Sequence, residues 1–184
     1  MAPPSPAAKG PEPPRISPGS PADQAALAQV ARKDKDWGVR KAAVERLTDQ
    51  AVLAEVASAD EDVDIRRLAA GRLTLQGALA KVATSDKDWS VRKAAAARVA
   101  DQGVLARIAT TDKDADIRKL AVGLLTDQAA IARVARNDQD WSVRLSAVER
   151  LTDKAALAQV ALHDPDPAIR RLAVGKLADL PAAP

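Results

Sequence analysis

Apolar residues recur along this chain with the spacing of α-helices, in short stretches separated by polar turns. Leu27, Val30 and Ala31 stand three and four positions apart, which places them on one face of a helix. Val39 and Ala43 begin a second stripe of the same kind. No segment shows the alternation with period two that indicates a strand, and no hairpin dipeptide separates apolar runs. The pattern predicts pairs of short helices and no sheet.

This two-helix pattern is repeated six times without a gap. Each copy has 26 residues and fits the template D-Q-x-x-L-A-x-V-A-x-x-D-x-D-x-x-V-R-x-x-A-x-x-x-L-T. Asp23 and Asp36, with their equivalents, are predicted N-caps of the two helices, and Pro167 falls at a first helical position, where proline is tolerated. The copies are 23–48, 49–74, 75–100, 101–126, 127–152 and 153–178.

Each predicted helix has roughly ten residues, and isolated helices of that length are marginal in water. Connections of about three residues force neighbouring helices to run antiparallel. A single pair cannot bury its own apolar stripes, so identical pairs must stack on one another. The sequence therefore predicts an all-α fold, a right-handed α-solenoid (superhelix) of six helix-turn-helix repeats.

The run D-x-D-x-x-V-R-x-x-A, seen most plainly as HDPDPAIRRLA at 163–173, resembles the signature of HEAT-like repeats. The resemblance covers residues 23–178, although a unit of 26 residues is shorter than usual and closer to the related leucine-rich-repeat variant. That variant implies that the first helix of each copy can be partly 3₁₀. The iron–sulfur cluster known in the variant needs cysteines, which this chain lacks.

The resemblance also implies a ladder in which the Arg of each copy binds carboxylates of its own copy and of the adjacent one. A guanidinium can bridge two carboxylates in a planar, bidentate way that lysine cannot, and no copy replaces this Arg by Lys. The ladder residues are Asp34, Arg40, Asp60, Arg66, Asp86, Arg92, Asp112, Arg118, Asp138, Arg144, Asp164 and Arg170.

Odd and even copies differ, so the full period is 52 residues. Odd copies carry Trp37, Trp89 and Trp141, the only aromatic residues, each followed five positions later by a small residue, whereas even copies have Leu at that later position. This exchange of volumes predicts that the tryptophans are core residues packed between units. The alternative is a row of exposed platforms on which nucleic-acid bases stack. Even copies also have a glycine within the second helix, which predicts a close neighbour at Gly71, Gly123 and Gly175.

Composition narrows the chemistry that the chain can perform. The 184 residues include no cysteine, which excludes disulfides, thiolate nucleophiles and Cys metal sites. The six D-x-D pairs are interpreted as helix caps and Arg partners rather than as calcium ligands. The only histidine, His163, lies at a position that varies between copies, and no nucleophile set or phosphate loop is present. We therefore expect no catalytic residue, no metal and no cofactor, and a protein that is not an enzyme.

Basic residues form two rows on the second helices when the copies are stacked, and five of the six copies contribute to each row. The first row is Lys41, Arg67, Lys93, Lys119 and Arg171, and the second row is Arg46, Arg72, Arg98, Arg150 and Lys176. These residues are candidates for partner binding, because such rows attract an acidic protein surface or a nucleic-acid backbone. The alternative is a solvated helix face partly paired with Glu45 and Glu149.

An extended surface without catalytic groups favours a scaffold or adaptor that binds another protein, through the basic rows or along the first helices, where the copies differ most. Nucleic-acid-backbone binding through the basic rows, as in some HEAT-like DNA-repair proteins, is the alternative. A second alternative is an accessory subunit similar to HEAT-like bilin-lyase proteins. The sixth copy keeps its apolar stripe although only ADLPAAP follows it, which leaves apolar area for end-to-end self-association.

The terminal segments do not fit the template. Residues 1–22 hold eight of the twelve prolines and no apolar run, which predicts a disordered, Pro-rich N-terminal tail. Residues 179–184 are a short C-terminal tail. Because there is no secretory signal and no stretch of 18 apolar residues, we expect no membrane contact and a cytoplasmic location.

Overall fold

The computed structural model describes residues 20–181, and every regular element within that range is an α-helix. The predicted tail at 1–22 lies outside the described residues except for its last three positions, and 182–184 also lie outside them. Helix α1 begins at Pro21, so the helical array starts slightly before the first copy of the template.

The twelve helices of the described range alternate between a first and a second helix in each copy. The first helices are α1 (Pro21–Lys33), α3 (Gln50–Ala59), α5 (Gln76–Ser85), α7 (Gln102–Thr111), α9 (Gln128–Asn137) and α11 (Lys154–His163). The second helices are α2 (Trp37–Arg46), α4 (Val63–Arg72), α6 (Trp89–Ala96), α8 (Ala115–Leu124), α10 (Trp141–Arg150) and α12 (Pro167–Asp179).

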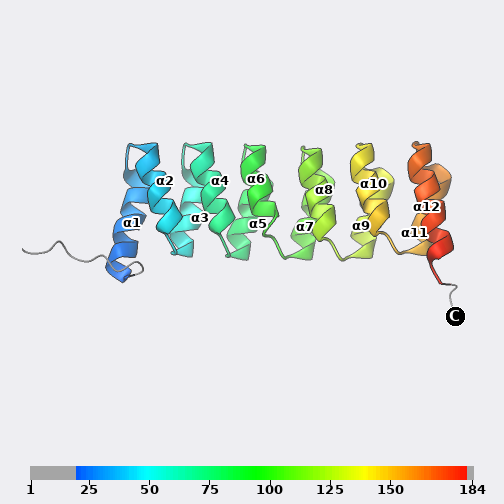
Figure 1. Ribbon diagram of the computed structural model, residues 1–184, viewed down its shortest axis with the longest axis horizontal. Coiled ribbons are helices and arrows are strands. Elements are labelled where there is room, and N and C mark those ends of the chain that lie inside the picture. The colour runs from blue at the N-terminus through cyan, green and yellow to red at the C-terminus, as the bar shows by residue number, and fades with distance from the viewer. Residues whose placement is uncertain (1–19, 182–184) are drawn as a thin grey trace, which may run out of the picture.

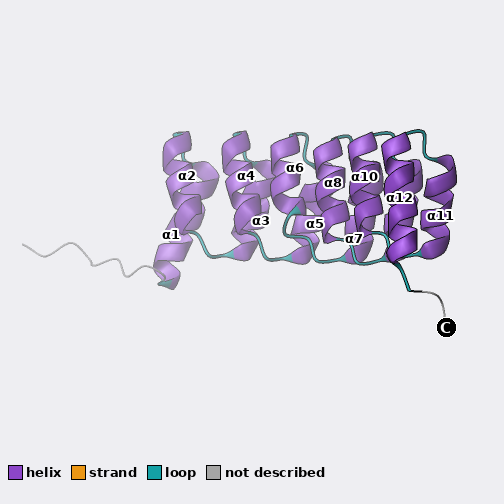
Figure 2. Ribbon diagram, turned by 45° about the vertical axis from the view of Figure 1, so that its right-hand side comes forward, coloured by secondary structure: helices purple, strands orange, loops and turns teal. Residues whose placement is uncertain are grey.

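The copies stand side by side in one row (Figure 1), with the second helices on the near face and the first helices on the far face. The turns within copies lie along the upper edge, which we name the turn edge, and the connections between copies lie along the lower edge; Figure 2 shows the same two rows of loops. Each helix packs against its partner in the copy and against the equivalent helix of the next copy. The architecture is an α-solenoid, which confirms the predicted fold class.

Aspartate caps most of the helices, as the template predicts. Asp62 accepts hydrogen bonds from two backbone amides of the first turn of α4, at 2.8 and 3.2 Å. These amides have no partner within the helix, so the carboxylate stabilises the helix start. Asp49 caps α3 in the same way. The prediction is wrong for Asp23, which lies inside the first turn of α1, because that helix begins earlier and is capped by Ser20.

The first helices are α-helical, so the partly 3₁₀ geometry implied by the resemblance is wrong for this chain. Helix α3, for example, has ten residues and ends with the amide of Asp60 donating to the carbonyl of Val56 at 3.1 Å. Its buried residues Leu53, Val56 and Ala57 are spaced by three and four positions. That spacing matches 3.6 residues per turn, whereas a 3₁₀ helix would turn the stripe away from the core.

The core lies between the two helix layers and is built from Ala, Val, Leu and Ile. Leu53 on α3 and Ile65 on α4 are at most 1% exposed, and the equivalent residues of the internal copies are buried to the same degree. The Leu that follows most second helices, such as Leu73 after α4, is also fully buried. Stacking therefore removes from water the apolar area that one helix pair would leave exposed.

A Gln–Thr clamp closes the copies at the lower edge. The Oε1 atom of Gln50 accepts hydrogen bonds from the amide of Thr74 at 2.7 Å and from its hydroxyl at 3.0 Å. The Nε2 atom of Gln50 donates to the carbonyl of Arg72 at 3.4 Å. The clamp joins the start of the first helix to the end of the second, which explains why Gln and Thr recur in the template.

Candidate interaction surface

The predicted Asp–Arg ladder joins each copy to the next one. Arg40 donates from Nε to Oδ2 of Asp60 at 3.0 Å and from Nη2 to Oδ1 at 3.2 Å. The two side chains are each 6% exposed, so the pair is shielded from water on nearly all sides. The same bond recurs as Arg66–Asp86, Arg92–Asp112, Arg118–Asp138 and Arg144–Asp164.

Within its own copy, the ladder Arg binds the backbone and not the carboxylate that the resemblance implies. The Nη1 atom of Arg40 donates to the carbonyl of Asp34 at 2.9 Å and to that of Lys35 at 3.3 Å. The Asp34 carboxylate instead accepts the amide of Asp36 at 2.9 Å, which shapes the turn. At the five internal joints this division of partners satisfies the guanidinium and the carboxylate of the next copy, so the ladder is structural there and offers no free charge to a ligand.

The charged state of these groups is stabilised by the same contacts. The hydrogen bond from Arg118 to Asp138 raises the pKa of the guanidinium above its ordinary value, and Asp112 raises the pKa of Arg92 in the same way. At the start of α6, the hydroxyl of Ser90 donates to Asp88 at 2.6 Å and lowers the pKa of that carboxyl. These pKa shifts favour the charged forms of the two ladder arginines and of the Asp88 cap.

The second basic row is not the free stripe that we expected from the sequence, because most of its members bind the preceding copy. Arg98 donates to the carbonyl of Leu73 at 2.8 Å, and Arg150 donates to that of Leu125 at 2.7 Å. These carbonyls belong to the C-caps of α4 and α8, where the helix dipole favours a positive charge. Arg72 donates to the C-cap carbonyl of Leu47 in the same way, and Lys176 donates to the carbonyl of Glu149 in the last turn of α10.

Only Arg46 of the second row makes no such contact among the described residues, because α1 and α2 form the first copy that the structure describes. The stacking of the copies determines these contacts, because each of the other basic side chains of the second row lies next to the C-terminal end of a helix in the preceding copy. Apart from Arg46, the second row therefore contributes mainly to joining the copies.

The tryptophans are exposed, which contradicts the prediction that they are core residues. Trp37 is 56% exposed, Trp89 is 51% exposed and Trp141 is 57% exposed. Each is the first residue of its helix, directly after the capping Asp at the turn edge. The buried stripe of α6 begins with Val91, two positions later, and two positions correspond to about 200° around a helix. The indoles therefore lie on the side of the second helices that faces away from the core.

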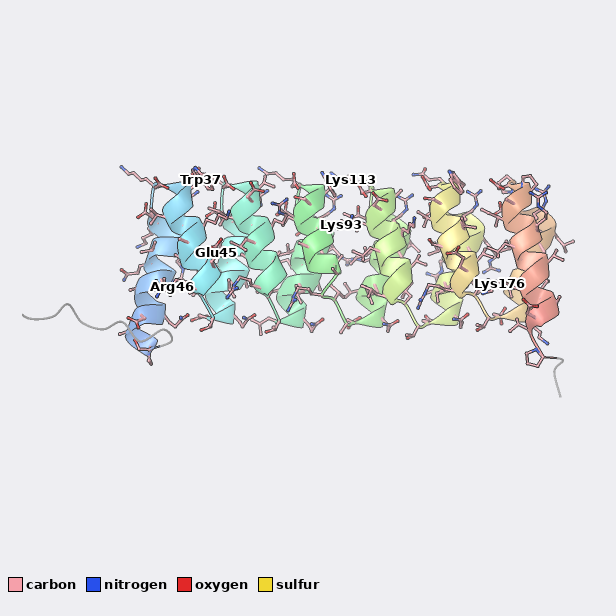
Figure 3. The ribbon with its side chains drawn as sticks, in the orientation of Figure 1. Trp37, Glu45, Arg46, Lys93, Lys113 and Lys176 are labelled. Atoms are coloured by element: carbon pink, nitrogen blue, oxygen red, sulfur yellow. The ribbon has the colours of Figure 1, made fainter. Side chains whose placement is uncertain are left out.

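The first basic row shares this surface with the tryptophans. The Lys41 ammonium lies over the Trp37 ring at 6.0 Å from its centroid, and that of Lys93 lies over Trp89 at 5.7 Å. Figure 3 shows Trp37 at the turn edge of α2 and Lys93 on α6, both on the second-helix face. We name this surface the tryptophan face and define it by Trp37, Trp89, Trp141, Lys41, Arg67, Lys93, Lys119 and Arg171.

The tryptophan face carries acidic groups as well. Arg67 donates to Asp64 at 2.7 Å, and the partners are both more than half exposed. Asp116 takes the same place on α8, and Glu45 and Glu149 are exposed on α2 and α10. The face is therefore mixed in charge, with basic groups beside two of the indoles.

The glycines of the even copies have no close neighbour, so that prediction is also wrong. A Cβ atom added at Gly71, Gly123 or Gly175 would meet nothing within 4 Å. Odd copies carry Glu45, Ala97 and Glu149 at the same position of the template, all exposed. The surface of the second helices consequently alternates between odd copies, which expose an indole, and even copies, which expose a glycine without a side chain.

No helix among the described residues combines the length and the apolar character that crossing a membrane would require. The chain matches no protein-family model, no curated protein and no solved structure. What the residues and the geometry establish is a helical repeat array whose second helices expose three regularly spaced indoles.

Proposed function

We propose that this chain is a HEAT-like repeat scaffold that binds another protein through the tryptophan face. The observation that carries the proposal is the exposure of every indole of the chain on one face, at the same position of every second copy. Folding gives no reason for this placement, because the core is complete without the indoles. Tryptophan and arginine are the residue types that most often dominate the energy of protein interfaces.

The spacing of the indoles limits the shape of the partner. Stacked helices lie about 8–10 Å apart, so tryptophans in alternate copies are separated by roughly 16–20 Å. An extended segment rises about 3.3 Å per residue and would cover that distance with about five or six residues. We therefore expect a partner segment with apolar anchors at that interval and acidic residues next to them, which would meet Lys41 and Lys93.

Single-stranded nucleic acid is the second candidate, because bases stack on exposed indoles. The charge of the surface argues against it. Most of the second basic row binds carbonyls of the preceding copy, and Asp64 and Glu45 lie on the tryptophan face itself. A polyanion would meet these carboxylates, whereas a protein segment of mixed charge can pair with them.

Selection from a displayed library of random peptides on the immobilised full chain tests the proposal. We expect enriched peptides that carry apolar and acidic residues at the stated interval, and these peptides should lose binding to the triple variant Trp37→Ala, Trp89→Ala, Trp141→Ala. A matched control is Leu124→Ala, which removes a partly exposed apolar side chain from the second-helix face. Enriched peptides that bind the triple variant as tightly as the native chain would contradict the proposal.

A parallel titration with a thymidine oligonucleotide separates the two candidates. Because the chain has no Tyr or Phe, its fluorescence arises from the three indoles. Quenching by the oligonucleotide that weakens steeply between about 50 and 200 mM salt would support nucleic-acid binding instead. We expect no such quenching, and we expect a selected peptide to shift the emission to shorter wavelength.

A further inference from the structure

The two ends of the array expose complementary halves of the joint that links the internal copies. Each internal joint has a polar part, the Arg–Asp pair, and an apolar part. On the apolar side, Val148 of one copy and Ile169 of the next are at most 1% exposed. The joint is directional, because one copy always supplies Arg and the next always supplies Asp.

The C-terminal end carries the arginine half without a partner among the described residues. Arg170 donates from Nη1 to the carbonyls of Asp164 at 2.6 Å and Pro165 at 3.1 Å, and every other ladder Arg makes the first of these two bonds within its own copy. Its Nε and Nη2 atoms meet no carboxylate in the described part of the chain. Val174 on α12 is 56% exposed, although the equivalent residues Val122 and Val148 are fully buried.

The N-terminal end carries the aspartate half. The Asp34 carboxylate accepts the amide of Asp36 at 2.9 Å, as its equivalents do in later copies. In residues 20–181 no guanidinium reaches it, whereas each of its five equivalents binds one. Val39 on α2 is 44% exposed, although Ile65 and Val91, its equivalents, are fully buried.

We infer that two copies of this chain associate head to tail, with Arg170 of one copy binding Asp34 of the next. Val174 of the first copy then packs near Val39 of the second, and the contact repeats a joint that the fold already contains between every two neighbouring copies. The occupant is a second copy rather than another protein, because each end offers the charge and the apolar residue that the other end lacks.

The helix ends are compatible with this joint. Helices α1 and α12 have 13 residues each, against ten for most internal helices. The added residues of α1 precede Gln24, and those of α12 follow Lys176. Both additions lie at the lower edge in Figure 1. Arg170 and Val174 belong to the part of α12 before its addition, and Val39 belongs to α2, which has no addition. The ends differ from one another, so the contact is heterologous and leads to open filaments rather than to a closed dimer.

Sedimentation velocity of the full chain over a wide range of concentration tests the inference. Two chains lose translational and rotational freedom when they associate, so association depends on protein concentration. We therefore expect the mean molecular mass to rise reversibly with concentration. Arg170→Glu and Asp34→Arg each place like charges across the joint, and each should raise the dissociation constant about tenfold or more. A strictly monomeric native chain at the highest concentration would overturn the inference.

Mixing the two charge variants provides the sharper test. The C-terminal end of the Arg170→Glu variant can pair with the N-terminal end of the Asp34→Arg variant, because the charges at that joint are exchanged but remain opposite. The native pair Arg170–Asp34 forms at the alternate joint. The mixture should therefore recover the association that each variant alone has lost. Failure of the mixture to recover it, with both variants folded by circular dichroism, would overturn the proposed pairing.

Substitutions at apolar positions distinguish loss of association from loss of folding. Val174→Glu changes a side chain that is already more than half exposed, so it should abolish association without lowering the unfolding temperature. Leu124→Glu places the same charge in the middle of the array and should leave association unchanged. Equal loss in both variants would contradict an end-to-end joint. The peptides selected for the tryptophan face should bind Val174→Glu normally, so the two proposals fail separately.

Discussion

Arg118 binds Asp138 of the next copy through two parallel hydrogen bonds, from Nε to Oδ2 at 2.7 Å and from Nη2 to Oδ1 at 2.9 Å. Each of these side chains is 5% exposed. The pair lies at a joint in the middle of the array, so it couples the folding of the copies on either side.

Replacement of Arg118 by Ala should lower the free energy of unfolding by about 3–5 kcal/mol, because the Asp138 carboxylate would remain buried without a charged partner. Arg118→Lys should recover only part of the loss, since an ammonium cannot make the bidentate contact. Urea unfolding measures both. The control is Arg170→Ala, which lacks a carboxylate partner among the described residues and should cost much less; equal costs at the two positions would contradict the ladder.

Replacement of Trp89 by Ala should change stability little, because the indole is 51% exposed and lies outside the core. Leu79→Ala is the comparison, since that side chain is fully buried and its loss should cost about 2–5 kcal/mol. Thermal unfolding of both variants gives the answer. If the Trp89 variant lost as much stability as the Leu79 variant, the exposed position of the indole would be wrong.

Replacement of Gly123 by Ala should raise stability by up to about 1 kcal/mol, because a helix-interior glycine costs conformational entropy and the added methyl group meets open space. Gly38→Ala is the matched control, since its Cβ would lie 3.1 Å from the carboxylate of Asp36, the N-cap of α2. Thermal unfolding should show a gain for the first variant and a smaller gain or a loss for the second. A loss at Gly123 would indicate a neighbour that the described residues do not include.

Replacement of Ser90 by Ala should lower the stability of the chain above about pH 4 and change it little in stronger acid. The Ser90 hydroxyl lowers the pKa of Asp88 below its ordinary value. A lowered pKa in the folded chain stabilises the fold above about pH 4, the unfolded value, and this contribution disappears as pH falls through the folded value. Loss of the hydroxyl returns the pKa toward the ordinary value, so the variant lacks this contribution above about pH 4 and its stability falls less steeply on acidification than that of the native chain.

Urea unfolding at a series of pH values between about 2 and 6 measures how the free energy of unfolding of each variant depends on pH. Ser142→Ala should behave like Ser90→Ala, because Ser142 lowers the pKa of Asp140 in the same way. The control is Ser85→Ala, whose hydroxyl donates to the carbonyl of Lys81 and not to a carboxylate. Parallel pH profiles for all three variants and the native chain would show that the serine hydroxyls do not influence these caps.

The features that the sequence predicted correctly depend on spacing within one copy or on one contact repeated in every joint. Asp62 caps α4 because it directly precedes the helix, and Arg40 meets Asp60 because the copies stack in register. The prediction for the tryptophans was wrong because an exchange of volumes between copies resembles core packing. The position of Trp89 two residues before Val91 could have placed it opposite the buried stripe.

The sequence pattern contained no comparable indication that the second basic row binds the preceding copy. Whether Arg98 points to solvent or to the carbonyl of Leu73 depends on how closely one copy approaches the next, and a repeat pattern does not contain that distance. The Gln50–Thr74 clamp is similar, because its two residues stand at opposite ends of one copy and meet only after the helices have paired. Contacts between residues that come together only when helices or copies pack could thus not be predicted from the sequence.

Because odd and even copies alternate, the number of exposed indoles that can bind a partner increases with the number of copies in the array. Adding one odd and one even copy would add one indole at the same interval and leave the Arg–Asp pair of every existing joint unchanged, since all joints share that pair. A partner with several anchors gains from each further anchor through an increase in effective concentration, so its affinity would multiply with each added pair of copies. Duplication of a 52-residue segment is therefore a route to tighter binding that demands no change in any single contact.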